Sequence, residues 1–211
     1  MMDKLEGDAG VEQLGHREYV GGLWDEMGKL QFDFMISRGL KPEHVMLDIA
    51  CGALRGGVHF IRYLEPGHYL GMDKESQLID RGLEHELGRD AEAEKRPQFV
   101  ISGQFEFSKF DKKPDFCLAQ SLFSHLVPDD MRFCLRQLRA HVNPGCRFYV
   151  TFLQTRLKLL KRNPGSSHDH DAFYYTKSEM VGLGPDTGWQ ANYIGDWNHP
   201  RRQKMMEYVA I

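Results

Sequence analysis

The hydrophobic positions of the chain follow two alternating periods from residue 45 onward. Short uninterrupted apolar runs are typical of strands buried on both faces of a sheet, and residues recurring every three or four positions are typical of one helix face. Helices are predicted after residue 57, around Ile79, Leu83 and Leu87, and from Pro128. The runs that predict strands are 45–49, 68–73, 98–102, 115–121 and 146–153. This alternation predicts an α/β fold with a mostly parallel sheet and helices on both faces.

The last part of the chain has a different pattern. Residues 190–197 and 204–211 are two strand-like runs joined only by residues 198–203. A connection this short cannot carry a crossover helix, so the two runs are expected to pair antiparallel. With the earlier runs they predict a single-domain, doubly wound, seven-stranded sheet ending in an antiparallel β-hairpin. Upstream, a helix is predicted with one apolar side made of Leu23, Met27, Leu30 and Phe34.

Composition narrows the classes of function. A chain of 211 residues, 41% of them hydrophobic, is large enough for one domain with a substantial core. The formal net charge of −3 argues against nucleic acid as a partner, because domains that bind it carry a basic face. The polar N-terminal stretch lacks the apolar core of a signal peptide, and no run approaches the length of a membrane span. Four scattered cysteines predict buried thiols, so we expect a cytoplasmic protein that does not bind membranes.

The stretch LDIACGALRGG (47–57) follows the first predicted strand and has the small residues of a ligand-binding turn. The dinucleotide fingerprint, aligned on Gly52, requires glycines at two positions where this chain has Ala50 and Arg55. A Gly-Lys-Ser/Thr phosphate loop is also missing from the sequence. The turn therefore suits the close approach of a ligand but lacks a phosphate-binding pattern.

From this first strand onward the sequence resembles the class I S-adenosylmethionine-dependent methyltransferases. In that family an Asp-x-Gly-x-Gly turn passes under the methionine part of the cofactor, and an acidic residue ending the second strand accepts both ribose hydroxyls. The resemblance implies these roles for Asp48, Gly52 and Asp73. An acceptor-only carboxylate independently suits a diol, and glycine lets the backbone approach a ligand closely. Ala50 and Leu54 stand where the family usually has glycine, so the turn is expected to differ locally.

Further cofactor-binding positions are implied by the resemblance. Gln104 and Phe105 follow the third strand, where the adenine binds, and Gln120 follows the fourth, near the methionine end. Tyr19 precedes a Gly-Gly pair in a segment that resembles an N-terminal lid over the cofactor. Plainer interpretations stay open: an ordinary loop with a core aromatic for the first pair, and the N-terminal turn of a packed helix for Tyr19.

Methyl transfer is an in-line displacement at an already activated methyl group, so a base is needed only when the acceptor holds its proton tightly. Catalytic groups in an open α/β sheet gather at the carboxyl ends of the strands. The candidate bases are therefore His125, after the fourth strand, and His199, between the last two. His199 is favoured because Pro200 biases it to an extended conformation. The HDHD stretch 168–171 is not expected to bind a metal, because adjacent residues of an extended segment point to opposite sides.

The predicted organisation is an N-terminal helical lid, residues 1–40, and a methyltransferase domain, residues 41–211. A basic stretch within residues 154–177 is either a solvated helix and loop or a cap over the acceptor pocket. The expected function is methyl transfer from S-adenosylmethionine to a small-molecule acceptor, through an oxygen of a sugar or natural-product intermediate. The alternatives are a nicotinamide-dependent oxidoreductase and a catalytically inactive S-adenosylmethionine-binding protein. The sequence specifies neither the acceptor nor the oligomeric state.

Overall fold

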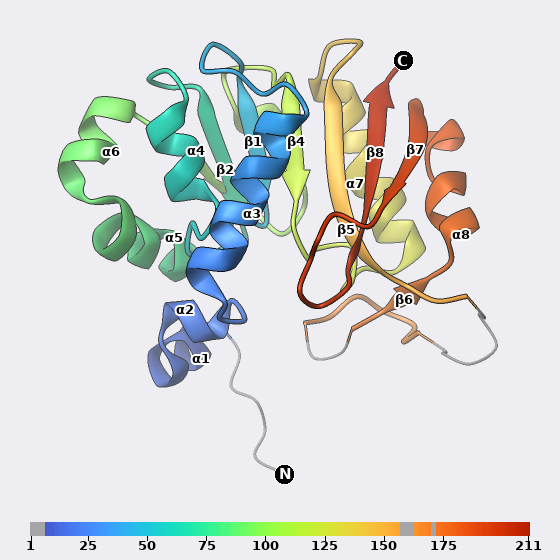
Figure 1. Ribbon diagram of the computed structural model, residues 1–211, viewed down its shortest axis with the longest axis horizontal. Coiled ribbons are helices and arrows are strands. Elements are labelled where there is room, and N and C mark those ends of the chain that lie inside the picture. The colour runs from blue at the N-terminus through green and yellow to red at the C-terminus, as the bar shows by residue number, and fades with distance from the viewer. Residues whose placement is uncertain (1–6, 157–162, 170–171) are drawn as a thin grey trace. The chain divides into compact units, whose positions relative to one another are not determined.

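The computed structural model describes residues 7–156, 163–169 and 172–211. The chain forms two compact units, residues 1–103 and residues 104–211. In Figure 1 the first unit is coloured blue to green and the second yellow-green to red. Each unit is described by its own strands and helices, and each contributes a separate group of candidate site residues.

The described part of residues 1–103 contains a parallel sheet in the order β3-β2-β1. Its strands are β1 (Met46–Ile49), β2 (Tyr69–Asp73) and β3 (Gln98–Ile101). Every residue of β1 and β2 is buried, which explains why these strands are apolar in the sequence apart from Asp48 and Asp73. The helices are α1 (Gly7–Leu14), α2 (His16–Tyr19), α3 (Trp24–Ser37), α4 (Gly57–Tyr63), α5 (Ser76–Gly82) and α6 (Arg89–Lys95), with a π-helical turn at Leu83–Leu87.

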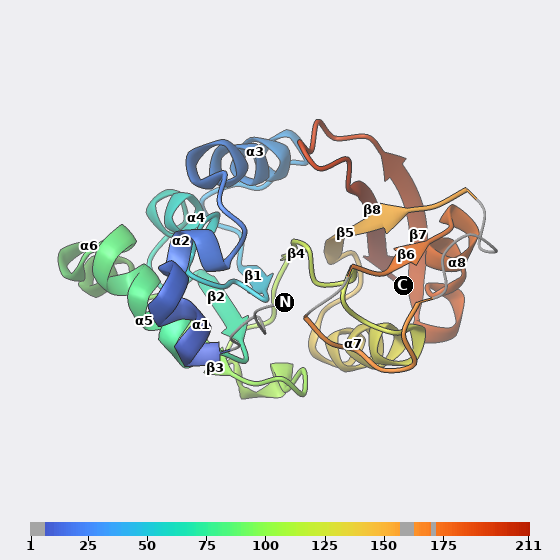
Figure 2. The same cartoon turned by 90° about the horizontal axis from the view of Figure 1, so that it is seen from below.

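Close packing places the N-terminal helices beside the turn that follows β1. A Cβ at Gly28 of α3 would collide with the carbonyl oxygen of Arg55, so glycine is required for α3 to pack this closely. Helices α1 and α2 lie against α5 in both views of the molecule (Figures 1 and 2). Val11 of α1 packs with Ala53 and Leu78 in a small buried cluster. The N-terminal segment is thus part of the core of this unit.

The described part of residues 104–211 contains a mixed sheet in the order β4-β5-β8-β7. Strands β4 (Phe116–Ala119) and β5 (Arg147–Gln154) are parallel, whereas β8 (Lys204–Ala210) is antiparallel to both β5 and β7 (Trp189–Gly195). The short strand β6 (Tyr174–Tyr175) pairs in parallel with the end of β5. The helices are α7 (Pro128–His141) and α8 (Lys177–Gly182), with 3-10 turns at Phe107–Lys109 and Pro185–Thr187.

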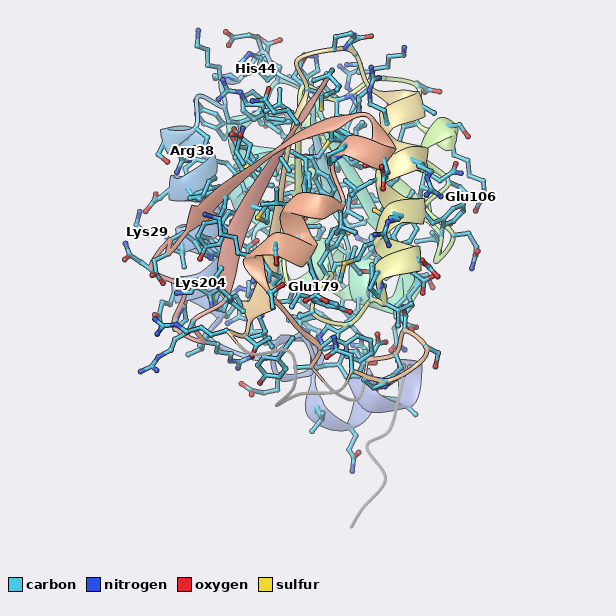
Figure 3. All side chains as sticks on the ribbon, turned by 90° about the vertical axis from the view of Figure 1, so that its right-hand side faces the viewer. Lys29, Arg38, His44, Glu106, Glu179 and Lys204 are labelled. Atoms are coloured by element: carbon cyan, nitrogen blue, oxygen red, sulfur yellow. The ribbon has the colours of Figure 1, made fainter. Side chains whose placement is uncertain are left out.

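Aromatic packing and polar caps fix the helices of this second unit. The ring of Phe148 on β5 lies 6.2 Å from that of Trp189 on β7, and both side chains are buried. The Trp189 indole N–H donates to the carbonyl of Leu135 at 3.0 Å, which joins β7 to α7. Helix α8 begins with a capping box, in which Thr176 and Glu179 each accept the other's backbone N–H (Glu179 is labelled in Figure 3). The helix start is therefore satisfied locally.

The seven long strands and the helices α3, α4, α5 and α7 agree with those predicted from the sequence, whereas α8 was not predicted. All seven predicted strands are present, and their ends differ from prediction by no more than two residues. Helix α6 was missed because it buries none of its side chains and so has no apolar face, and β6 was missed because it is two residues long. The four cysteines are buried and free, as predicted. Within the described ranges, none of the helices has the length and apolar character needed to cross a membrane.

Candidate functional site

The turn after β1 has an unusual backbone at three alternate residues. The φ angle is 59° at Ala50, 54° at Gly52 and 65° at Leu54, so all three are in the left-handed region. Glycine adopts this conformation without steric cost, whereas an L side chain costs about 1–2 kcal/mol. The Leu54 side chain is wholly buried, and its packing offsets part of that cost. The turn therefore follows a path suited to glycine although only one of the three residues is glycine.

Asp73 ends β2, and its carboxylate faces this turn. The side chain is buried, with Oδ2 accepting the backbone N–H of Gly52 at 2.8 Å and Oδ1 accepting that of Glu75 at 3.0 Å. Burial raises the pKa of the Asp73 carboxyl, and the backbone hydrogen bonds oppose the rise. A carboxylate offers about four lone-pair sites, so Asp73 can also accept hydrogen bonds from ligand hydroxyls.

Asp48 lies one strand away, within β1. The hydroxyl of Tyr69 donates to its Oδ2 at 2.9 Å, and both side chains are buried. The pKa of Asp48 is raised to about 7, because burial and the charge of Asp73 raise it by more than the Tyr69 hydrogen bond and the charge of Arg55 lower it. Two buried carboxyl groups repel each other when both are ionised, so a cation near them is favoured.

The segment between α2 and α3 covers the same turn. Arg55 Nη1 donates to the carbonyl oxygens of Val20 at 3.1 Å and of Gly22 at 2.8 Å. A Cβ added to Gly52 would lie 3.2 Å from Val20 Cγ1, so the Val20 side chain rests on the turn. Tyr19, the predicted lid residue, packs against the buried cluster of Val11, Ala53 and Leu78. Sequence reasoning did not identify the anchoring role of Arg55, because its partners are backbone carbonyls that no motif marks.

A cluster of ionic and aromatic contacts fixes α2. The carboxylate of Glu86 accepts from His16 Nε2 at 2.6 Å and from Arg17 Nε and Nη2 at 2.7 Å. Although burial raises the pKa of the Glu86 carboxyl, the hydrogen bonds from Arg17 and His16 hold it below the ordinary value. The Arg17 guanidinium also lies 5.0 Å from the centre of the Trp24 ring, at the start of α3.

A polar cluster in residues 104–211 gathers side chains at the carboxyl ends of β4 and β5. Thr151 Oγ1 accepts the backbone N–H of Ser121 at 2.7 Å, and Gln203 Nε2 donates to Ser121 Oγ at 2.9 Å. The amide nitrogen of Gln120 lies 3.0 Å from both Ser121 Oγ and His199 Nε2. The structure thus brings together two predicted site residues, Gln120 and His199. Sequence reasoning missed Thr151, which resembles an ordinary strand residue, and Gln203, which precedes β8.

The tautomer of His199 follows from its hydrogen bonds. Nδ1 accepts the backbone N–H of Arg201 at 3.0 Å. A neutral imidazole whose Nδ1 accepts carries its hydrogen on Nε2. The ring is only 8% exposed and lies 5.3 Å from that of Trp197, whose indole N–H donates to the Gln203 carbonyl at 3.1 Å. The other ring nitrogen, Nε2, faces the Gln120 amide.

His125 lies elsewhere, in the turn between β4 and α7. Its backbone N–H donates to the Leu122 carbonyl at 2.9 Å, and its carbonyl accepts the N–H of His168 at 3.2 Å. Gln104 is exposed after β3, and Phe105, with a left-handed φ of 53°, has its ring 6.2 Å from that of an α7 residue, Phe133. These contacts connect His125 with the 163–169 segment and Phe105 with α7.

The segment 163–169 is attached to the start of α7. Ser167 Oγ accepts the backbone N–H of Val127 at 2.9 Å and donates to the carboxylate of Asp130. The predicted cap lies partly outside the described residues, as do His170 and Asp171 of the HDHD stretch. Among the residues that the structure describes, no group of three or more His, Cys, Asp or Glu side chains is placed to hold a metal ion.

Comparison with known proteins identifies the family and the fold. A family model described as a methyltransferase domain matches residues 47–148. Magnesium protoporphyrin IX methyltransferase from Synechocystis PCC 6803, solved with bound S-adenosylmethionine, is similar with a TM-score of 0.62 and 12% identity, over 92% of this chain and 82% of that one. Human N-acetylserotonin methyltransferase, also solved with S-adenosylmethionine, has a TM-score of 0.66 and 12% identity. The match covers 94% of this chain and 56% of that one. The glycopeptide N-methyltransferase MtfA has a TM-score of 0.67 and 14% identity. The match covers 90% of this chain and 92% of that one.

The matched segment begins in β1 and ends in β5, and it includes the turn after β1 and Asp73. The structural similarity establishes the fold, and the family model identifies the matched segment as a methyltransferase domain. The fold is the predicted one, with a mostly parallel sheet and a C-terminal antiparallel pair of strands. Residues 47–148 therefore match a methyltransferase domain, and the chain has the fold of the class I S-adenosylmethionine-dependent methyltransferases.

Proposed function

We propose that this chain transfers a methyl group from S-adenosylmethionine to an oxygen of a small-molecule acceptor. The observation that carries the proposal is the pair of buried carboxyl groups, Asp48 and Asp73, beside the left-handed turn at Gly52. The ribose of the cofactor offers two hydroxyl donors, and its amino and sulfonium groups are cations, so acceptor-only carboxylates fit it. The pyrophosphate of a nicotinamide dinucleotide would be repelled by the same carboxylates.

The residues of the first unit would bind and enclose the cofactor. Asp73 would accept the ribose hydroxyls, Gly52 would let the backbone pass beneath the methionine part, and Asp48 would lie near the cationic groups. Tyr19 and the rest of residues 1–40 would act as a lid that excludes water. The cofactor itself supplies an activated methyl group, so the protein contributes mainly the position of the reactants. The weaker candidates for the adenine and methionine ends remain Gln104, Phe105 and Gln120.

The second unit would recognise the acceptor. Its polar cluster presents amide and imidazole donors, which suit oxygen-bearing groups. The similar solved proteins are named for a magnesium porphyrin, N-acetylserotonin and a glycopeptide, which supports a small-molecule acceptor without selecting one. His199, the favoured candidate base, lies within this cluster, and His125 stays the second candidate.

Replacement of Asp73 tests the proposal directly. Asp73→Ala removes the acceptor for the ribose hydroxyls and should weaken binding of S-adenosylhomocysteine by about 1.5–3 kcal/mol in titration calorimetry. Asp73→Asn keeps the size but loses the charge and should show an intermediate loss. Asp80→Ala, on an exposed carboxylate of α5, is the matched control. Unchanged affinity in a folded Asp73→Ala variant would remove Asp73 from the cofactor site.

Two further measurements separate the rival functions. A thermal-shift comparison of S-adenosylhomocysteine with nicotinamide dinucleotides should show stabilisation by the first alone, amounting to roughly 2.7 kcal/mol at a hundred times the dissociation constant. Stabilisation by a dinucleotide instead would favour the oxidoreductase. Release of S-adenosylhomocysteine from S-adenosylmethionine during an acceptor screen distinguishes an active enzyme from an inactive cofactor-binding protein.

A further inference from the structure

Tyr69 and Asp48 form a buried pair across the adjacent strands β1 and β2. In the parallel register Asp48 lies opposite Gly71, and Tyr69 is two positions earlier on β2, so both side chains are on the same face of the sheet. The Tyr69 hydroxyl donates to Asp48 Oδ2 at 2.9 Å, and the two residues are only 2% and 4% exposed. Within the described ranges, no second hydrogen-bond donor to the Asp48 carboxylate is found. Tyr69 is therefore the group that satisfies this buried carboxylate.

Two glycines leave the space that the Tyr69 side chain occupies. A Cβ added to Gly57, at the start of α4, would lie 2.6 Å from the Tyr69 hydroxyl oxygen, which is closer than Cβ contacts in real proteins. A Cβ added to Gly71 would lie 2.7 Å from the ring of Phe99, and that ring is in edge contact with Tyr69 at 6.0 Å. The packing on both sides thus fixes the position of the hydroxyl against Asp48.

Three other ionisable groups act on Asp48, and none of them replaces Tyr69. Asp73, at the end of β2, opposes the ionisation of Asp48, whereas Arg55, in the turn after β1, favours it through its charge. The Arg55 guanidinium donates to backbone carbonyls of the α2–α3 connection. Burial raises the pKa of the Cys51 thiol in the same turn, so that group stays neutral. Burial likewise raises the pKa of Tyr69 well above its ordinary value, so its hydroxyl stays a donor.

We propose that Tyr69 is a positioning residue that holds Asp48 as an oriented anion for the cationic part of the cofactor. The inference rests on the proposed function, because it places the amino or sulfonium group near Asp48. A buried carboxylate is disfavoured unless it accepts hydrogen bonds, and Tyr69 supplies one. Without that hydroxyl, Asp48 takes up a proton near neutral pH and no longer attracts a cation. Tyr69 thus acts through Asp48 and does not itself contact the cofactor.

Titration of the ligand-free protein tests the pair before any cofactor is added. Carbon NMR of labelled aspartate carboxyl groups, with Asp48 assigned by its loss in Asp48→Asn, should give a wild-type midpoint near its pKa of about 7. Tyr69→Phe should move this midpoint upward, because the charged form loses its donor. Gly57→Ala keeps the hydroxyl but crowds it, and should move the midpoint in the same direction. Tyr208→Phe, which removes a buried hydroxyl bonded to the Met180 carbonyl, is the matched control and should leave the midpoint unchanged.

The pH dependence of affinity separates positioning from packing. Tyr69→Phe should weaken S-adenosylmethionine binding roughly tenfold near neutral pH and by less in alkaline buffer, where Asp48 ionises without the hydroxyl. The neutral nucleoside 5′-methylthioadenosine, which lacks both cationic groups, should bind the variant and the wild type equally. In an Asp48→Asn background, Tyr69→Phe should add no pH dependence. A hydroxyl that serves packing alone would instead lower the free energy of unfolding and leave the pH profile and the preference between the two ligands unchanged.

The outcomes separate this inference from the proposed function. A wild-type protein that does not bind S-adenosylmethionine contradicts the proposed function, and the inference with it. A wild-type protein that binds it, but whose Tyr69→Phe variant keeps the wild-type titration midpoint and pH profile of affinity, contradicts the inference alone.

Discussion

Ala50, Gly52 and Leu54 share a left-handed backbone but differ in what their side chains allow. Gly52 is the residue on which the covering segment rests, and Leu54 contributes its side chain to the core. Ala50 has only a methyl group to accommodate. At position 50 the backbone strain therefore depends on the size and branching of the side chain at Cβ.

Substitution at Ala50 should reveal this strain. Ala50→Gly relieves about 1–2 kcal/mol of it but loses about 0.5–1 kcal/mol to chain entropy, so the free energy of unfolding should change little or rise slightly. Ala50→Val places a β-branched side chain at positive φ and should lower the free energy of unfolding by at least about 1 kcal/mol. Chemical denaturation of both variants measures the difference. Equal stability of Ala50→Val and wild type would show that the turn is not strained.

The proximity of single residues could be predicted where a residue type has one physical use. Glycine in a turn after a strand and an acid ending the next strand led to Gly52 and Asp73, and the structure places them in hydrogen-bond contact. Arg55 and Gln203 could not be predicted, because their partners are a distant backbone segment and a side chain in the turn after β4. Such contacts depend on the tertiary fold, which sequence spacing does not encode.

At the scale of elements, the segment between α2 and α3 and the turn after β1 behave as one unit. Arg55 holds the segment through two carbonyl oxygens, and Val20 rests on Gly52. The ionic cluster at Glu86 secures α2 at the other end. A ligand that passes over Gly52 must therefore displace or share the place of Val20.

A double substitution separates these two occupants of Gly52. Gly52→Ala introduces a Cβ that crowds Val20, so amide hydrogens of the α2–α3 connection should exchange faster and S-adenosylhomocysteine should bind more weakly. Adding Val20→Ala should restore the slow exchange, because the methyl group then fits. Affinity should stay low, since the cofactor needs the same space. Full recovery of affinity would mean that Gly52 serves only to seat Val20.

The order of strands and helices could be predicted from periodicity because most elements bury one recognisable set of apolar side chains. The runs that became β1 and β2 are buried at every residue. Helix α6 buries none, and the π-helical turn Leu83–Leu87 continues α5 under a single apolar pattern. Apolar periodicity shows which residues are buried but not which backbone hydrogen bonds they make. It therefore cannot reveal α6 or separate the π-helical turn from α5.

For the whole molecule, the buried carboxyl of Asp48 couples folding to pH. Its pKa is raised from 3.8 to about 7 in the fold. The unfolded chain therefore ionises first, and the free energy of unfolding should fall as pH rises from about 4 to about 7 and then level off with respect to this group. Binding of a cation near Asp48 should reverse the effect by favouring the carboxylate.

Calorimetry can test this coupling. Binding of S-adenosylmethionine just below pH 7 should release a proton from Asp48, so the measured enthalpy should depend on the ionisation enthalpy of the buffer. The affinity should rise with pH toward about 7 and then become constant. In Asp48→Asn the proton release and the pH dependence should both vanish. Proton release that persists in this variant would assign the coupling to another group.

Strand β8 lies between β5 and β7 although it follows both of them in the chain. A ribosome makes the chain from its N-terminus, so both neighbours leave the exit tunnel before the strand that joins them. Until β8 emerges, β5 exposes an unpaired row of backbone hydrogen-bonding groups, and β7 has no strand to pair with. The nascent chain therefore passes through an interval in which a chaperone must shield that edge, or a strand of a neighbouring nascent chain can occupy it.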